Sequence, residues 1–366
     1  MQLWAKVDAT SENGTTRVGG VPLIARHVRM AARQKWAGAV VVVDEKNRPR
    51  VERVIADAPA PEGFPVEITP QAPSSSSRTY VPLRGDSLYS ASALGQAADT
   101  STPPVPLMTL SDATERGKAS RVLIRSLRKP MELDGIVAYT MIRPISRACA
   151  LAIADTKLTP NHVTLMAMAC GIVAGLVAAA GGALAYALAG ILYWWSNVVD
   201  CVDGELARLR LETSRGGEWL DTVADDVCTY GLMIGLGVGL WHDGQGVIWL
   251  YLGVGGALGS VFFKALMYWD LHRKGLPIDT TFFPWFFGAA AESMENKTRF
   301  LDRLLHVIGY VFRKDSYVTL LALVLVVPMP RLAALGLLVG DALFAVMLTA
   351  HFVVTAARRG RQVSSP

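Results

Sequence analysis

The sequence predicts an α-helical polytopic membrane protein with a small cytoplasmic α/β domain at its N-terminus. Six transmembrane helices and one juxtamembrane amphipathic helix are expected. Hydrophobic residues make up 51% of the 366 residues and charged residues 18%, a balance that excludes a disordered chain. Long uncharged runs are confined to residues 161–357, whereas residues 1–160 have the composition of a soluble protein. This split predicts a membrane domain behind a soluble front end.

Six apolar runs in the second half are candidates for membrane crossing, at a helical rise of about 1.5 Å per residue. They are Val163–Gly181, Ala183–Val199, Val227–Trp241, Gly246–Phe263, Ser316–Val327 and Leu332–Ala357. An even number of spans places both chain ends on the same side of the membrane.

Basic residues predict the orientation. The first residues, MQLWAKVDATSENG, lack the apolar core of a signal peptide, so we expect residues 1–160 to be cytoplasmic. The loops on the other side then contain a single basic residue, Arg331, as the positive-inside rule requires. We therefore expect a multi-pass protein of the cytoplasmic membrane with both termini in the cytoplasm. The net charge of +5 does not indicate a nucleic-acid partner, because many basic residues flank the apolar runs.

An acidic segment, DCVDGELARLRLETSRGGEWLDTVAD, covers residues 200–225. Helical spacing places one group of its residues on a single face: Asp200, Asp203, Gly204, Ala207 and Arg208. A second group shares a face of the next helix: Gly217, Asp221 and Asp225. The intervening turn, 209–216, is short enough to make the two helices antiparallel neighbours. Four aspartates should therefore converge near the cytoplasmic surface.

Four ionised aspartates at such range must take up protons or hold cations. Oxygen ligands suit hard divalent ions such as Mg²⁺, Mn²⁺ or Ca²⁺. Gly204, Ala207 and Gly217 lack bulk, so an anionic ligand can approach the backbone, and Arg208 offers a fork suited to phosphate. Acids at helix ends can also simply mark the water boundary. Four inward-facing acids that coincide with small residues and an arginine favour a site for a nucleotide diphosphate.

The segment matches D-x2-D-G-x2-A-R-x8-G-x3-D-x3-D at all eight fixed positions. This pattern resembles the signature of the CDP-alcohol phosphotransferase (CDP-alcohol phosphatidyltransferase) family. The resemblance covers about 129–357, because Leu158-Thr159-Pro160-Asn161 is also similar to the family's entry into its first span.

The resemblance implies the chemistry. A CDP-alcohol binds with its pyrophosphate on two divalent ions, Mg²⁺ or Mn²⁺, and an acceptor alcohol attacks the β-phosphorus and expels CMP. The implied metal ligands are Asp200, Asp203, Asp221 and Asp225. The implied CDP-binding residues are Asp200, Gly204, Ala207, Arg208 and Gly217. Asp225 is also the implied catalytic base, in keeping with the weak nucleophilicity of an alcohol. A homodimer is implied as well.

The acceptor is less sharply defined by the sequence. Members of the family that use inositol phosphate resemble this chain at three basic positions, Arg215, Lys264 and Arg313, although Lys264 replaces an arginine. These side chains suit a phosphorylated polyol, and they equally suit residues that snorkel at the membrane edge.

CDP-diacylglycerol is the expected donor, because the site lies at the level of the bilayer lipid, and phospholipid biosynthesis is the expected role. A soluble CDP-polyol that gives an inositol phosphodiester is the alternative. An ion-coupled transporter, from another class, would distribute its acids along a pore and show inverted repeats. The acids here cluster at one face.

Residues 18–44 predict a helix around 24–32 followed by a buried strand at 39–43. Gly20-Val21-Pro22-Leu23-Ile24, and Asp86 after a later strand, resemble a cytidylyltransferase or nucleotidyltransferase core. In such a core, the glycine-rich loop that binds the triphosphate should precede residue 18. The only stretch that could supply it, Asn13-Gly14-Thr15-Thr16-Arg17, is too short. We therefore expect a reduced, inactive domain at 1–100, a linker at 101–128, the juxtamembrane helix at 129–159 and the membrane domain at 160–358. A sensor or partner-binding role for the front domain is a further alternative.

Overall fold

The computed structural model describes residues 2–73, 77–100, 102–129, 134–276, 283–284 and 314–363. The chain forms two compact units. The first comprises Met1–Pro130, Ser146–Pro160 and Val202–Thr213, and the second comprises Met131–Ile145, Asn161–Cys201 and Ser214–Pro366. Residues 202–213 of the acidic segment therefore belong to the same compact unit as the front domain.

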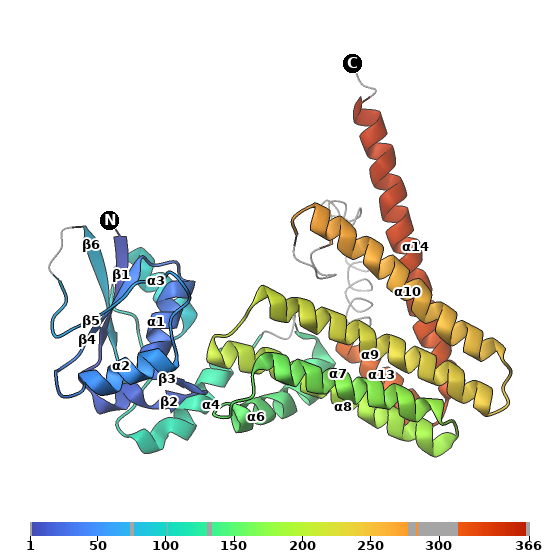
Figure 1. Ribbon diagram of the computed structural model, residues 1–366, viewed down its shortest axis with the longest axis horizontal. Coiled ribbons are helices and arrows are strands. Elements are labelled where there is room, and N and C mark those ends of the chain that lie inside the picture. The colour runs from blue at the N-terminus through green and yellow to red at the C-terminus, as the bar shows by residue number, and fades with distance from the viewer. Residues whose placement is uncertain are drawn as a thin grey trace, which may run out of the picture. The chain divides into compact units, whose positions relative to one another are not determined.

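A four-stranded parallel sheet forms the centre of the first unit (Figure 1). Its order is β5 (Val66–Thr69), β4 (Gly38–Val42), β1 (Gln2–Asp8) and β6 (Arg78–Arg84). Valines fill β4, which is buried along most of its length, as expected for a strand that helices cover on both faces. The first residue of β4, Gly38, lies directly under the ring of Trp4. Position 38 requires glycine because an added Cβ would come within 2.4 Å of that ring.

Helices α1 (Leu23–Arg33), α2 (Arg48–Asp57) and α3 (Ala91–Thr100) accompany the sheet. The helix and strand predicted from residues 18–44 are thus confirmed as α1 and β4. A short hairpin, β2 (Arg17–Val18) with β3 (Val21–Pro22), precedes α1. Its turn consists of Gly19 and Gly20, both with positive φ, a conformation that glycine adopts most readily.

The region expected to be a linker, 101–128, is largely structured. Strand β8 (Met108–Thr109) pairs antiparallel with β7 (Ser87–Leu88), and α4 (Arg116–Ser126) buries Leu123 and Ile124. The expected juxtamembrane segment contains the π-helical turn η3 (Ala138–Ile142) and helix α6 (Arg143–Ile153). Arg143 donates two hydrogen bonds to the Asp134 carboxylate, at 2.9 and 3.0 Å.

His27, on α1, makes the stability of the first unit depend on pH. Its ring is fully buried, with Nε2 2.8 Å from the Ser87 carbonyl oxygen, and this burial lowers the pKa of His27 to about 4. The charge of Arg26 contributes to this lowering of the pKa, whereas Asp86 and the Ser87 hydrogen bond oppose it. In the unfolded chain, His27 takes up a proton near pH 6.5. The contribution of neutral His27 to the free energy of unfolding is therefore complete above that pH and is lost as the pH falls toward 4.

We expect the free energy of unfolding of the first unit to fall by about 2 kcal/mol between pH 7 and pH 5 on account of this group. Denaturant titrations of the full chain at several pH values, followed by hydrogen exchange of α1, would measure the slope. His27→Gln cannot take up the proton and should flatten the slope, even if it lowers stability at pH 7. An unchanged slope in this variant would exclude His27 as the cause.

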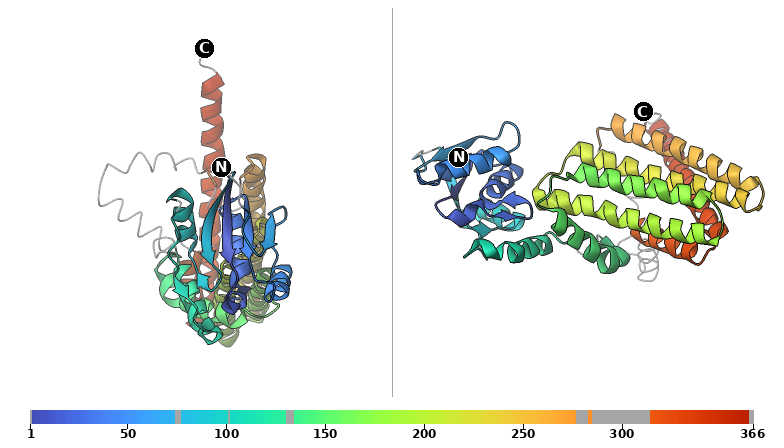
Figure 2. Two further views of the ribbon diagram at one scale, coloured as in Figure 1. Left: turned by 90° about the vertical axis from the view of Figure 1, so that its left-hand side faces the viewer. Right: turned by 60° about the horizontal axis from the view of Figure 1, so that its bottom comes forward.

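Helices make up the described part of the second unit (Figures 1 and 2). The long ones are α7 (Pro160–Ala179), α8 (Ala183–Arg210), α9 (Arg215–His242), α10 (Ile248–Arg273), α13 (Lys314–Val326) and α14 (Pro330–Val363). The residues of α8 from Val202 onward belong to the first unit. Helices α7 and α9 pack closely because glycines face each other. A Cβ on Gly235 would lie 2.0 Å from the Gly175 carbonyl oxygen.

Among the described residues, four helices are long and apolar enough to cross a membrane: Pro160–Ala179, Arg215–His242, Ile248–Arg273 and Pro330–Ala357. These spans fit an integral membrane protein. The expectation of six is corrected to four by this measure. Helix α8 carries Asn197 and Asp200 at the end of its apolar run, and α13 is 13 residues long as described, so length and composition alone do not identify either one as a span.

Candidate metal and nucleotide site

Three of the four predicted aspartates lie together. Asp200 and Asp203 on α8 and Asp221 on α9 each offer one carboxylate oxygen, and these oxygens all lie within 4.8 Å of one another. Asp203 is 7% exposed, and the other two are half-buried. One helical turn separates Asp200 from Asp203. The oxygen-only donor set fits a hard divalent cation.

The connection between the two helices has the predicted form. Helix α8 ends at Arg210 and α9 begins at Arg215. Ser214 is the N-cap of α9, and its hydroxyl accepts a hydrogen bond of 3.0 Å from the Gly217 amide. An added Cβ on Gly217 would lie 3.1 Å from that hydroxyl and 3.2 Å from Asn161 Oδ1. Gly217 therefore suits the close packing at the start of α9.

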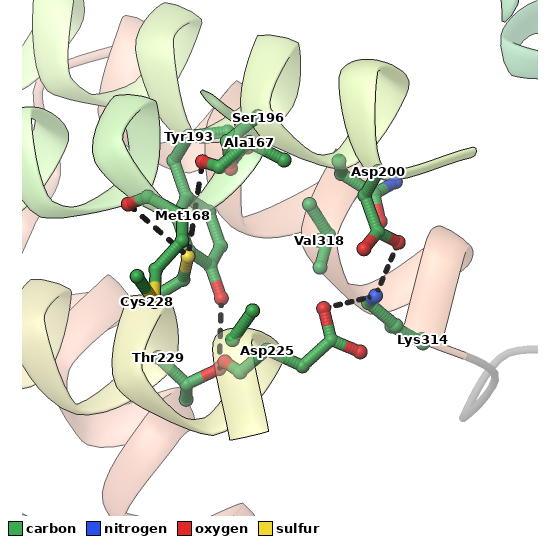
Figure 3. A pocket seen from close by; sticks show the side chains of 12 residues that line it. Ala167, Met168, Tyr193, Ser196, Asp200, Asp225, Cys228, Thr229, Lys314 and Val318 are labelled. Carbon is green, nitrogen blue, oxygen red and sulfur yellow. Dashed lines mark hydrogen bonds and ion pairs between the residues drawn. The ribbon is translucent and has the colours of Figure 1, made fainter. Parts of the chain in front are cut away.

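Asp225, the fourth predicted ligand, is engaged by a lysine that the sequence did not indicate. Lys314 Nζ lies 2.5 Å from Asp225 Oδ1 and 2.8 Å from Asp200 Oδ2, so one ammonium group bridges both carboxylates (Figure 3). Lys314 begins α13, 114 residues after Asp200. Asp200 is thus shared between the three-aspartate cluster and the lysine bridge.

A small cavity of about 20 Å³ lies beside this bridge, room for about one water molecule. Its polar lining comes from α8, α9 and α13 (Figure 3) and includes Asp200, Asp225, Lys314, Asn197, Tyr193 and Thr229. The Tyr193 and Thr229 hydroxyls lie 3.1 Å apart and link α8 to α9. Asn197 donates a hydrogen bond of 3.3 Å to Asp315. These contacts hold the three helices around the acids.

Three of the predicted nucleotide-binding residues, Gly204, Ala207 and Arg208, lie in the last turns of α8, whereas Gly217 lies on α9. Arg208 lies 3.3 Å from a Glu205 carboxylate oxygen, and Arg147 lies 3.5 Å from the other oxygen. Glu205 is 2% exposed. Arg208, which the sequence predicts to bind phosphate, is therefore held by an acid one turn earlier on its own helix. Gly204 leaves space beside the Arg208 guanidinium, which an added Cβ would approach to 3.5 Å.

The three predicted acceptor residues have different surroundings. Arg215 is exposed at the first position of α9. Lys264 on α10 lies 2.6 Å from Asp226 Oδ1, and Tyr268 donates a hydrogen bond of 2.6 Å to Asp226 Oδ2. Arg313 lies outside the described residues. Asp226 and Tyr268 were not singled out from the sequence, and no local spacing links them to Lys264.

Lys314 should compete with divalent cations for Asp200 and Asp225. We expect Lys314→Met to be less stable than the wild type without metal, because two close carboxylates lose their counter-charge. Added Mn²⁺ should then raise the melting temperature of the variant more than that of the wild type. Thermal unfolding in detergent with and without Mn²⁺ would measure both effects.

Lys274→Met is the matched control for this experiment, because Lys274 pairs with Asp270 at the exposed end of α10. Its Mn²⁺-induced shift should equal that of the wild type. If Lys314→Met also showed the wild-type shift, the prediction that the Lys314 ammonium group competes with the metal would be wrong.

The sequence matches a family model described as CDP-alcohol phosphatidyltransferase over residues 157–313. Three similar proteins are each named "Bifunctional IPC transferase and DIPP synthase". The protein from Thermococcus kodakarensis is 32% identical over 144 residues, which is 39% of this chain and 31% of the relative. The one from Aquifex aeolicus is 28% identical over 141 residues (38% and 32%), and the one from Rubrobacter xylanophilus is 44% identical over 91 residues (24% and 20%). The matched part of the chain thus spans about a third or less of each relative.

Proposed function

We propose that the chain transfers a substituted phosphate group from a CDP-alcohol to an acceptor alcohol and releases CMP. The premise is the match of residues 157–313 to the CDP-alcohol phosphatidyltransferase family. One observation carries the proposal. Three aspartates of the eight-residue motif bring their oxygens within 4.8 Å of one another, on the two helices that also carry the nucleotide-binding positions.

A soluble CDP-polyol is the better-supported donor. The expected donor was CDP-diacylglycerol, but the relatives are named as IPC transferases and DIPP synthases, which favours the inositol phosphodiester alternative. We propose CDP-inositol as the donor and inositol phosphate as the acceptor. Phospholipid biosynthesis is accordingly not part of the proposal.

The residues of the motif have separate proposed roles. Asp200, Asp203, Asp221 and Asp225 would hold Mg²⁺ or Mn²⁺, and such ions neutralise charge on the attacking and leaving oxygens of a phosphoryl transfer. The acceptor hydroxyl forms the new P–O bond, the bond to CMP breaks, and the hydroxyl proton passes to the Asp225 carboxylate. Gly204, Ala207, Arg208 and Gly217, with Asp200, would cradle the CDP. Arg215, Lys264 and Arg313 would bind the acceptor phosphate, with Lys264 held toward Asp226.

The remaining expectations complete the proposal. Both termini would lie in the cytoplasm, and the chain would form a homodimer. The division into 1–100, 101–128, 129–159 and 160–358, with a front domain inactive in cytidylyl transfer, belongs to the same proposal.

CMP release by the full chain in detergent tests the function. CDP-inositol and CDP-diacylglycerol would each be offered with inositol 1-phosphate, glycerol 3-phosphate, serine or inositol, in the presence of Mg²⁺ or Mn²⁺. We expect release from CDP-inositol with inositol 1-phosphate. Release from CDP-diacylglycerol alone would restore the lipid donor. No release from either donor, together with cation flux into proteoliposomes, would favour the transporter.

A further inference from the structure

Three arginines on one side of helix α1 contact the last residues of α8 and the turn that follows it. Arg26, Arg29 and Arg33 are spaced three and four residues apart, so they share a helix face. Arg26 Nη2 donates a hydrogen bond of 2.6 Å to the Leu209 carbonyl oxygen, and Arg29 Nη1 donates one of 3.0 Å to that of Arg210. Arg33 donates a hydrogen bond of 2.8 Å to the Thr213 hydroxyl. All these residues belong to the first compact unit.

The turn needs such partners because a helix leaves its last carbonyl groups without intrahelical donors. A guanidinium at a helix C-terminus also interacts favourably with the helix dipole. Leu211 has a φ of 58°, a left-handed conformation that is uncommon for residues other than glycine. Its side chain packs against the hydrophobic core of the α/β domain. Helix α8 therefore ends in a conformation that the front domain stabilises.

Arg26 lies at the buried centre of this contact. Its side chain is 1% exposed, and Nη2 also donates a hydrogen bond of 2.8 Å to the Val18 carbonyl oxygen. Burial, together with the charges of Arg29 and Arg33, lowers the pKa of Arg26 to about 9. Burying a cation is costly unless hydrogen bonds compensate, so its position against the Leu209 carbonyl indicates a specific contact.

Helix α8 also contributes an arginine of its own, Arg210, which contacts the end of α6. Arg210 donates hydrogen bonds to the carbonyl oxygens of Ala154, Ile153 and Thr156 at 3.0, 2.9 and 2.7 Å, and a further one to Leu158. It thereby binds the C-terminal end of α6. The hairpin turn of the front domain reaches the same point, since a Cβ on Gly20 would lie 2.1 Å from the Ala154 carbonyl oxygen. The end of α8 is thus held by α1 and by the end of α6.

We propose that Arg26 and Arg29 are positioning residues for the transfer reaction. They fix the last turns of α8, which carry Asp203 and Arg208, and the turn that leads to Asp221. In this way the α/β domain supports the transfer reaction, because its arginines hold the end of α8 in place. The proposal rests on the proposed function, and it gives the front domain a role within the same chain.

Arg29→Met in the full chain is the main test, because Arg29 is less buried than Arg26 and its loss endangers folding less. Arg29→Lys keeps a cation without the fork. Val51→Ala is the control, since Val51 is a core residue of the same domain, is 1% exposed and lies on α2 rather than at the turn. It should lower the melting temperature without altering the turn.

Three readouts separate positioning from general stability. Arg29→Met should speed amide exchange in residues 207–214, weaken Mn²⁺ binding by about tenfold, as measured by the EPR signal of free Mn²⁺, and raise KM for the CDP-alcohol more than it lowers kcat. Arg29→Lys should give intermediate values. Val51→Ala should change none of the three.

The proposal is overturned if Arg29→Met matches the wild type in exchange and Mn²⁺ binding, or if Val51→Ala produces the same changes. Amide exchange and Mn²⁺ binding require no turnover. If the wild type released no CMP, the proposed function would fail, whereas these two measurements would still decide whether Arg29 positions the end of α8.

Discussion

Replacing Asp225 with asparagine is expected to lower the rate of CMP release by roughly 10³-fold, within the range for loss of a general base. Asparagine preserves the size of the side chain but cannot accept the proton of the acceptor hydroxyl. It also weakens the bridge to Lys314, whose ammonium lies 2.5 Å from Asp225 Oδ1. Lys314 keeps its second partner, Asp200, so the variant should still fold. Product release measured at saturating donor and acceptor would report the change in kcat.

Glu218→Gln is the matched control, because Glu218 is an exposed acid on the same helix, outside the motif. It should retain wild-type turnover. Both variants should elute as the wild type does from gel filtration in detergent. Near-normal CMP release by Asp225→Asn would remove the base role from Asp225, while the metal site of the other three aspartates would stand.

The local parts of this arrangement could be predicted from the sequence. The spacing of Asp200 and Asp203 requires only the helical repeat to place them on one face, and a short turn brings Asp221 to them. The cluster of these three oxygens confirms that prediction. Helix α1 and strand β4 were likewise evident, because an amphipathic run followed by consecutive valines reflects burial against one sheet.

The distant contacts could not be predicted in the same way. Lys314 reaches Asp200 across 114 residues, and Arg26 reaches Leu209 across 183. A single sequence contains no periodicity that relates such positions. The number of spans was also overestimated by composition, since α8 combines an apolar run with the polar residues of the site. A helix that carries several acidic and other polar residues has less hydrophobic character than a simple span.

Asp203→Asn is expected to abolish tight binding of Mn²⁺ and to lower CMP release by at least about 100-fold. Asp203 is the most buried of the three clustered acids, and its replacement leaves two carboxylates where three had converged. A ligand at 100 times its dissociation constant stabilises a folded protein by about 2.7 kcal/mol. The wild type should therefore melt at a higher temperature with Mn²⁺ than after chelation, and Asp203→Asn should lose this difference.

Asp270→Asn tests whether the loss is specific to the cluster, because Asp270 is an acid at the end of α10 that pairs with Lys274. It should keep both the Mn²⁺-induced rise in melting temperature and the activity. The metal-free forms of Asp203→Asn and the wild type should melt at similar temperatures, since the substitution removes repulsion between carboxylates as well as any contact of Asp203. A full Mn²⁺ response in Asp203→Asn would mean that Asp200 and Asp221 bind the ion without it, and the three-aspartate site would then be wrong.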